Sequence, residues 1–453
     1  MSHLLTIRRA VVPFLSMLPG FVLCGANDYT YTGGSASNDW TEGDNWDGPS
    51  DPEFPGNGDN AIIDGTPAFL VLDQFIALTD FSLSGVSASS IQFDGNVLIA
   101  NKINASGVTR NLSKGSGTGS GVLTVNGEAT IGTLSTSGVN YNSSGSLTLT
   151  DNGVSLFDSA SLTAVDVTLN QIVGASNMGG SDTTNISISG TLKNQSGSGL
   201  CPVSSVFEST GTIVSESGGF AFSRQATFKA LEIKSDTEIL FNGPSTANSA
   251  SVSFVDGGDL GFEGSLTVTG TFTSQASNDP DSEFEDAAVS VESRGGLGGS
   301  GTFQFAEGAP FTLVGGTQAE TGSLTNSGFF SWRGGKLRNF ENAAAGTITL
   351  PSTSISMDPP ENLGQFTNSG TINSFSPSLR LAPNSVLTTG AAGTFSILNG
   401  SLNVTSPGEG ENLGSFVNQG TFISKVSGVA GLQAPFMSSG RLAVRDGILS
   451  LFR

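Results

Sequence analysis

The sequence predicts an all-β protein, a single-stranded right-handed parallel β-helix (β-solenoid) with an N-terminal cap. Three observations predict it: apolar residues alternate with polar ones over short runs, turn-forming residues separate these runs, and a short phrase returns along the chain. Glycine supplies 62 of 453 residues, about twice its average share of roughly 7%. Beyond Ala26 no segment shows a sustained helical period, so we expect almost no helix.

The repeated phrase is clearest where Glu361–Ile372 returns fifty positions later as Glu411–Phe422. Its core is an apolar residue, any residue, asparagine or a substitute, any residue, glycine, any residue and a second apolar residue. Its glycines are spaced near multiples of a coil of roughly 20 to 25 residues, which favours stacked coils over a sandwich of hairpins. Looser copies occur at Leu123–Gly127, Ile186–Leu192, Phe207–Ile213, Leu266–Phe272, Leu324–Phe330 and Phe436–Leu442.

Residues 1–26 are predicted to be a signal peptide. Arg8 and Arg9 precede an apolar stretch, and small residues follow it, so that cleavage before Asn27 is expected. A lipoprotein anchor through Cys24 is disfavoured because the residue before it is leucine. A twin-arginine signal is disfavoured because the residues that usually surround the arginine pair are missing. We therefore expect bacterial export and a secreted or cell-surface location.

Removal of this leader limits the chemistry of the chain. Without Arg8 and Arg9, 16 of the 18 basic residues remain against 39 acidic ones, a net charge of −23, which disfavours nucleic acid and anionic membranes as partners. The leader also holds the single histidine, His3, and one of two cysteines. The mature chain then has no histidine, which excludes a histidine triad and histidine-ligated zinc.

Cys201 is the one thiol that such a mature chain keeps, so an internal disulfide and cysteine-based metal clusters are excluded. Its apolar, strand-like surroundings predict a small buried hydrophobic residue rather than a nucleophile. After the leader no apolar run of about twenty residues occurs, so no membrane span is expected in the mature chain.

Residues 27–66 are predicted to form the N-terminal cap. Trp40, Trp46 and several prolines gather there, and bulky rings with fixed turns suit the open end of a first coil. One alternative is a sugar-binding platform made by the two tryptophans. Another is a calcium site, for which the spacing lacks the pattern of an EF-hand; its ligands would be Asp44, Asp47, Asp51, Glu53 and Asp59.

The stretch Trp40–Trp46, followed by Pro55–Ile63, resembles the opening of exported bacterial repeat proteins related to autotransporter passengers, common in Planctomycetes and Verrucomicrobia. Leu83–Phe93 and Phe330–Leu337 resemble strand–turn units of that family. The resemblance implies a surface or secreted parallel β-helix, mostly without assigned activity. The chain departs from the family at its end, where neither a barrel pattern nor a sorting tail is apparent, so the mode of surface retention is left open.

Residues 67–453 are predicted to form the β-helix repeat domain, in strands of three to five residues such as Val122–Val125 and Leu147–Thr150. Coils stack about 4.8 Å apart, so equivalent positions form ladders. We expect Asn368 and its counterpart Asn418 to lie at a turn, where their amides can bond to neighbouring coils. The glycines Gly370 and Gly420 are expected to permit a bend that needs positive φ or no side chain.

Phenylalanine occurs 30 times against three tyrosines and three tryptophans. This bias predicts an internal stack of rings, since a sugar-binding surface would use rings with a polar handle. Glycine-rich segments at 114–121, 295–301 and 315–316 are predicted turns, because they lack the spacing of a phosphate loop.

The densest acidic run is Asn278–Asp286. Its carboxylates at Asp279, Asp281, Glu283, Glu285 and Asp286 could surround calcium. The run lacks an opening glycine and the nonapeptide of calcium-binding β-rolls, so a solvated loop is the favoured interpretation, and calcium binding is left open.

The main basic cluster is Arg333, Lys336 and Arg338 beside Trp332. In a β-helix lyase, an arginine or lysine base beside acid-bound calcium removes a proton from an acidic sugar. The same residues match a strand–turn–strand unit of the repeat, which is the favoured interpretation, so they are not assigned to a site.

We therefore expect a structural or adhesive protein without catalytic activity, metal or cofactor. Its partners would be cell-surface polysaccharide or other surface proteins. The alternative is a β-helix lyase or hydrolase acting on acidic polysaccharide, although the paired acids of hydrolysis cannot be recognised among 39 acidic residues. Arg441–Arg453 ends on a strand without an evident cap, which suggests assembly or a truncated chain, and the oligomeric state is left open.

Overall fold

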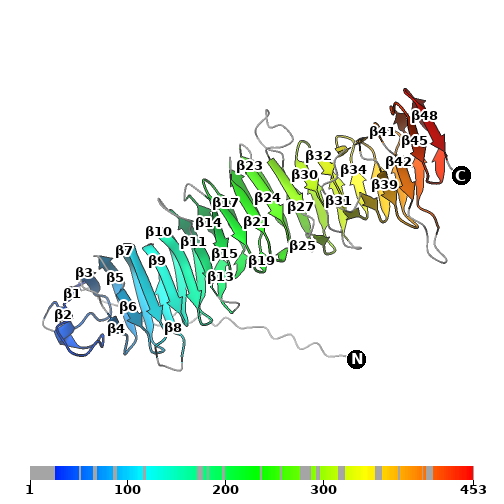
Figure 1. Ribbon diagram of the computed structural model, residues 1–453. Coiled ribbons are helices and arrows are strands. Elements are labelled where there is room, and N and C mark those ends of the chain that lie inside the picture. The colour runs from blue at the N-terminus through cyan, green and yellow to red at the C-terminus, as the bar shows by residue number, and fades with distance from the viewer. Residues whose placement is uncertain are drawn as a thin grey trace, which may run out of the picture.

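The computed structural model is an elongated parallel β-solenoid of about 15 turns, and its coils stack along the long axis (Figure 1). The predicted fold class is confirmed. Among the described residues, one sheet holds 42 strands and a second holds six. The structure describes residues 26–451, apart from 50–52, 65–68, 85–88, 116–118, 171–176, 181–182, 196–198, 235–236, 256–257, 276–286, 292–295, 315–321, 352–359, 376–377, 400 and 405–411.

The N-terminal end is closed by a short cap. Strand β1 (Asp28–Tyr31) pairs with β3 (Asn60–Asp64) in parallel and with β2 (Trp46–Asp47) in the one antiparallel pair among the described strands. A single 3-10 turn, η1 (Gly43–Asn45), precedes β2. This arrangement places bulky rings over the first coil.

Five of the eight strands described in the first coils are longer than the predicted three to five residues. The strands here are β4 (Phe69–Val71), β5 (Ile76–Ser84), β6 (Ser89–Gln92), β7 (Val97–Ser113), β8 (Gly121–Val125), β9 (Ala129–Ser137), β10 (Val139–Phe157) and β11 (Ser161–Leu169). The expected strand Leu147–Thr150 lies inside the 19 residues of β10. The predicted length is confirmed for β4, β6 and β8, and the expected strand Val122–Val125 lies in β8. It was wrong for the longer strands; in β10, register shifts between Leu149 and Gly153 bend the chain while pairing continues.

From β12 onward each coil carries up to three short strands, which form parallel ladders from coil to coil. The first ladder contains β13 (Asn185–Ile188), β16 (Val206–Ser209), β19 (Ala226–Thr227), β22 (Ser245–Ala247), β25 (Ser265–Val268) and β28 (Gly296–Gly298). Within the segment 295–301, a strand therefore occurs where a turn was predicted. Leu297 is the register partner of Leu266, and both side chains are buried, so β28 adds a last strand to this ladder.

The second ladder runs from the middle of the molecule to its C-terminal end. It contains β14 (Thr191–Asn194), β17 (Thr212–Ser215), β20 (Ala230–Lys234), β23 (Ala250–Val255), β26 (Thr271–Ser274), β29 (Thr302–Phe305), β31 (Ser323–Asn326), β34 (Phe340–Asn342), β37 (Gln365–Asn368), β40 (Val386–Thr389), β43 (Ser415–Asn418) and β46 (Phe436–Ser438).

The third ladder follows the second at each corner. It contains β12 (Asn177–Gly180), β15 (Leu200–Val203), β18 (Gly219–Phe222), β21 (Glu238–Phe241), β24 (Gly258–Phe262), β27 (Ala287–Val291), β30 (Pro310–Leu313), β32 (Phe329–Trp332), β35 (Thr347–Leu350), β38 (Thr371–Ser374), β41 (Thr394–Ile397), β44 (Thr421–Ser424) and β47 (Arg441–Val444).

The six-stranded sheet takes the same place in the coil order as the first ladder, since β33 precedes β34 as β28 precedes β29. It contains β33 (Lys336–Leu337), β36 (Glu361–Asn362), β39 (Ser378–Leu381), β42 (Ser401–Val404), β45 (Val429–Leu432) and β48 (Ile448–Leu451).

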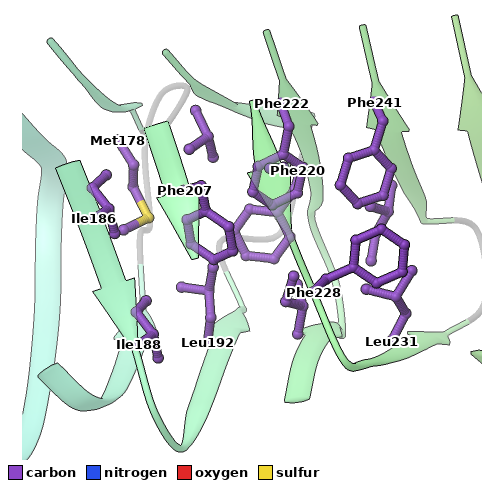
Figure 2. Packing of buried hydrophobic residues seen from close by; sticks show 14 of the residues in the cluster. Met178, Ile186, Ile188, Leu192, Phe207, Phe220, Phe222, Phe228, Leu231 and Phe241 are labelled. Atoms are coloured by element: carbon purple, nitrogen blue, oxygen red, sulfur yellow. The ribbon is translucent and has the colours of Figure 1, made fainter. Parts of the chain in front are cut away.

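Side chains alternate between buried and exposed along most of these strands, as a half-buried strand requires. Phenylalanine rings fill the inside and stack from coil to coil (Figure 2). Phe241 stacks on Phe222 with ring centroids 4.9 Å apart and on Phe262 at 5.2 Å, with interplanar angles of 12° and 8°. The predicted internal stack is confirmed.

The repeated phrase lies at corners, but at two different ones. Phe207–Ile213 joins the first ladder to the second, whereas Phe366–Ile372 joins the second to the third. The spacings measured between glycines in the sequence therefore combined glycines from two different corners, because the same residue pattern forms the turn at both. The pairing register defines the length of each coil directly. Leu192 pairs with Ile213, so one coil extends from Leu192 to Ile213.

Candidate functional site

Asparagines of the repeated phrase, together with Asn342 of β34, form a buried chain of amides inside one corner. The Nδ2 of Asn326 donates to the Oδ1 of Asn342 at 2.9 Å, and the Nδ2 of Asn342 donates to the Oδ1 of Asn368 at 2.8 Å. Asn418 continues the pattern by donating to Ser438 Oγ of the next coil at 3.0 Å. All four asparagine side chains are fully buried. The prediction that these amides bond to neighbouring coils is confirmed.

The glycines of the phrase fit because they have no side chain. A Cβ on Gly370 would lie 2.2 Å from the carbonyl oxygen of Gly346, and a Cβ on Gly420 would lie 2.2 Å from that of Gly390. Neither glycine has a positive φ. Of the two reasons considered for glycine at this corner, close approach of the neighbouring coil therefore applies.

The tryptophans of the cap point inward. Trp40 is fully buried and donates its indole N–H to the carbonyl oxygen of Pro55 at 3.0 Å, while Trp46 donates to the carbonyl oxygen of Trp40 at 2.8 Å. The two rings lie 4.9 Å apart, and Trp40 also meets Phe81 of the first coils. Rings held in this way cover the core, so the sugar-platform alternative is wrong for them.

The acidic residues of the cap have separate surroundings. Asp59 is nearly buried and accepts the backbone N–H groups of Asn27 at 3.2 Å and Gly56 at 3.0 Å. Asp44 and Asp47 are exposed. Within the described part of the chain, no group of three or more histidine, cysteine, aspartate or glutamate side chains is placed to hold a metal ion. The residue Asp51 and the acidic run 279–286 lie outside the described residues.

The members of the basic cluster around Trp332 have different surroundings: the Trp332 ring points into the core, and Lys336 and Arg333 contact different partners. The Trp332 ring is fully buried and stacks near Phe330, with centroids 5.9 Å apart. Lys336 Nζ lies 3.2 Å from a carboxylate oxygen of Glu361, its register partner one coil further on. Arg333 Nε donates to Ser331 Oγ at 3.4 Å. This cluster forms part of a strand–turn–strand unit, as the favoured interpretation expected.

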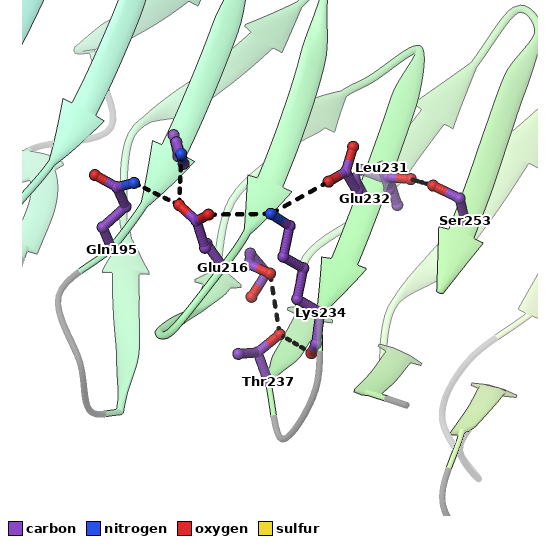
Figure 3. Close-up of polar contacts among 9 residues, drawn as sticks. Gln195, Glu216, Leu231, Glu232, Lys234, Thr237 and Ser253 are labelled. Carbon is purple, nitrogen blue, oxygen red and sulfur yellow. Dashed lines mark hydrogen bonds and ion pairs between the residues drawn. The ribbon is translucent and has the colours of Figure 1, made fainter. Parts of the chain in front are cut away.

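The strongest charged cluster lies elsewhere, at the outer side of the second ladder (Figure 3). Glu216 accepts from Lys193 at 2.5 Å and Gln195 at 2.5 Å on one side, and from Lys234 at 3.0 Å on the other. These hydrogen bonds, chiefly that from Lys193, lower the pKa of Glu216 to about 2. Three successive coils are thereby joined by one carboxylate.

Sequence reasoning missed this cluster. Its members are separated in the sequence and meet only because the register of the coils places β14, β17 and β20 side by side. The signal in the sequence is a glutamate flanked by lysines about one coil length away on each side. That signal becomes usable only when the length of each coil is known.

A second charged feature is a pair of like charges. Glu238 of β21 and Asp259 of β24 are register partners in adjacent coils. Burial raises the pKa of Glu238, and the nearby carboxylates of Asp259 and Glu263 raise it further. This arrangement opposes ionisation of Glu238, because the neighbouring groups carry the same charge and none of opposite charge compensates them in the pKa shift.

Cys201 lies in β15 and is fully inside the core. Burial raises the pKa of its thiol to about 12, so the nucleophilic thiolate form is suppressed. The predicted role as a small buried hydrophobic residue is confirmed. Among the described residues, no helix has both the length and the apolar character needed to cross a membrane.

Comparison with protein-family models, curated proteins and solved structures returned no match. The features that characterise this chain are hydrogen-bonded asparagines and glycines at the corners, aromatic rings in the core, and charged side chains that pair between adjacent coils.

Proposed function

We propose that the chain is a secreted or cell-surface structural or adhesive protein of bacteria, without catalytic activity. The observation that carries this proposal is the use of the repeated phrase. Its asparagine, glycine and phenylalanine residues make contacts between neighbouring coils. The most regular motif in the chain therefore serves to stack coils into a long, rigid solenoid. A long rigid solenoid suits a protein that presents surfaces at a distance.

Two features of the sequence support the surface location. Residues 1–26 have the order of charge, apolar stretch and small residues that typifies a signal peptide. The segments Trp40–Trp46 and Pro55–Ile63 resemble exported proteins related to autotransporter passengers. The partners that fit an acidic, serine- and threonine-rich surface are cell-surface polysaccharides or other surface proteins.

Export is tested by expressing the chain with its leader in a bacterial host and fractionating the cells. We expect the protein outside the cytoplasm, with Asn27 as its first residue by mass spectrometry. A control that starts at Asn27 behind an initiating methionine should stay in the cytoplasm. Retention of the leader-bearing chain in the cytoplasm would contradict the proposed location.

Catalysis is tested separately on the purified protein. Acidic polysaccharides are incubated with it, and the absorbance of unsaturated products and the appearance of new reducing ends are followed. We expect neither signal. Turnover that is lost in Lys336→Ala and in Glu361→Gln would instead establish the enzyme alternative at the pair that these residues form.

A further inference from the structure

The buried chain of amides is interrupted at one coil. Asn368 is the register partner of Thr389, and Thr389 is in turn the partner of Asn418. Thr389 and Asn418 are fully buried, yet within the described part of the chain Thr389 Oγ1 and Asn418 Oδ1 have no hydrogen-bond partner. In Asn342 and Asn368 the same side-chain oxygen accepts an amide N–H from the preceding coil. The bonds between side-chain amides therefore stop on both sides of Thr389.

The contacts between aromatic rings are interrupted at the same coil. They run from coil to coil as far as Phe366, whose ring centroid lies 4.6 Å from that of Phe340. The next register partner of Phe366 is Leu387, and a new run of rings begins at Phe395, 5.5 Å from Phe416. Among the described residues no ring contact joins Phe366 to Phe395. The coil formed by β40 and β41, which we call the junction coil, therefore separates two runs of rings as well as two runs of amides.

The backbone of the junction coil has the corner that carries an asparagine elsewhere. The turns 342–346 and 389–393 have the same length, and each contains a backbone hydrogen bond of 2.9 Å from its last residue to its second. In the first turn the side chain of Asn342 also donates to the carbonyl oxygen of Gly346 at 3.1 Å. The interruption therefore comes from the side chain of Thr389 and not from a different turn.

We propose that the junction coil is a built-in point of local opening, at which the solenoid separates more readily than at the coils before it. In a stacked array each coil is held by its two neighbours, so stability varies with the contacts at each interface. Backbone pairing continues across the junction coil, and Asn368 Nδ2 donates to the carbonyl oxygen of Thr394 at 3.1 Å. What is reduced is the contribution of the side chains, because buried polar atoms without partners destabilise the closed state. This proposal goes beyond the proposed function and holds wherever the protein is located.

Hydrogen–deuterium exchange of the purified, folded chain, followed by mass spectrometry of its peptides, tests the proposal. Peptides that cover β34, β37, β40 and β43 are compared under native conditions. We expect the exchange rate to rise in a step of about tenfold between β37 and β40, because local opening exposes the backbone N–H groups of β40. A uniform rate across these strands, or a gradual change without a step at β40, would overturn the proposal.

A single substitution tests the part played by Thr389. Thr389→Asn restores the amide chain from Asn368 to Asn418 and should slow exchange in β40 about tenfold. Thr388→Asn makes the same change at the neighbouring, partly exposed position and should leave exchange unchanged, as should both variants in β20. An unchanged circular dichroism spectrum shows that each variant is folded, and the step in the wild-type protein decides the proposal if Thr389→Asn does not fold. Equal exchange of β40 in the two folded variants would overturn it.

Discussion

The side-chain amide of Asn342 donates a hydrogen bond of 2.8 Å to the side-chain oxygen of Asn368 in the next coil, and both side chains are fully buried. The same amide donates to the carbonyl oxygen of Gly346 at 3.1 Å. A buried amide that bonds in two directions fixes the register of the coils, because a slip would leave polar groups without partners.

Replacing Asn342 with alanine should therefore lower the free energy of unfolding by about 2 to 4 kcal/mol, since more than one buried partner loses its bond. Asn373→Ala provides the control, because Asn373 lies on the partly exposed side of β38; we expect a change within about 0.5 kcal/mol there. Urea unfolding of both variants measures the difference. Equal midpoints would show that the amide chain does not stabilise the fold.

Glu216 should make stability depend on acid pH. Its pKa is lowered from 4.5 to about 2, so the folded state favours the carboxylate and the unfolded state binds the proton more readily. The stabilisation is then fully present above 4.5 and is lost as the pH falls through about 2. We expect the stability difference between wild type and Glu216→Gln to be constant near neutral pH and to shrink in this window.

Chemical unfolding at a series of pH values measures that difference. Glu208→Gln, which removes an exposed carboxylate on β16, serves as the control for general charge effects. If both substitutions give the same pH dependence, the contacts from Lys193 and Lys234 do not account for the stabilisation.

Cys201 should be unreactive in the folded protein. Burial both raises its thiol pKa to about 12 and blocks approach of a reagent. In the chain that begins at Asn27, where Cys201 is the one thiol, we expect a thiol-specific chromogenic reagent at mildly alkaline pH to label the native protein far more slowly than the protein in denaturant. Rapid labelling of folded protein would place the thiol at the surface and contradict its position in β15.

Much of this fold could be predicted because certain residue types, such as asparagine, glycine and phenylalanine, each favour one kind of local environment. Asparagine and glycine in the phrase indicated a turn, and the excess of phenylalanine indicated an internal stack. Gly370 lies in the bend before β38 and Phe366 is buried, whereas Asn368 is the last residue of β37, directly before the bend. The cap tryptophans were also predictable, since Trp40 and Trp46 are too large to remain exposed beside an open core.

The remaining features depend on lengths that local patterns do not encode. The coil from Leu324 to its register partner Phe340 is only about half as long as the coil from Phe272 to Phe303. Such variation hides which charges meet, as it did for Glu216. Long strands such as β10 were missed because a register shift replaces the turn residues that usually end a strand.

The account rests on the claim that the repeated phrase is a corner packed against the neighbouring coil, and Gly370 tests it most directly. Gly370→Ala adds one Cβ, which would meet the carbonyl oxygen of Gly346 at 2.2 Å, and Ser369→Ala changes the adjacent, partly exposed position. Urea unfolding should show a loss of about 1 to 3 kcal/mol for Gly370→Ala and a change within about 0.5 kcal/mol for Ser369→Ala. Equal stability of the two variants would contradict the account.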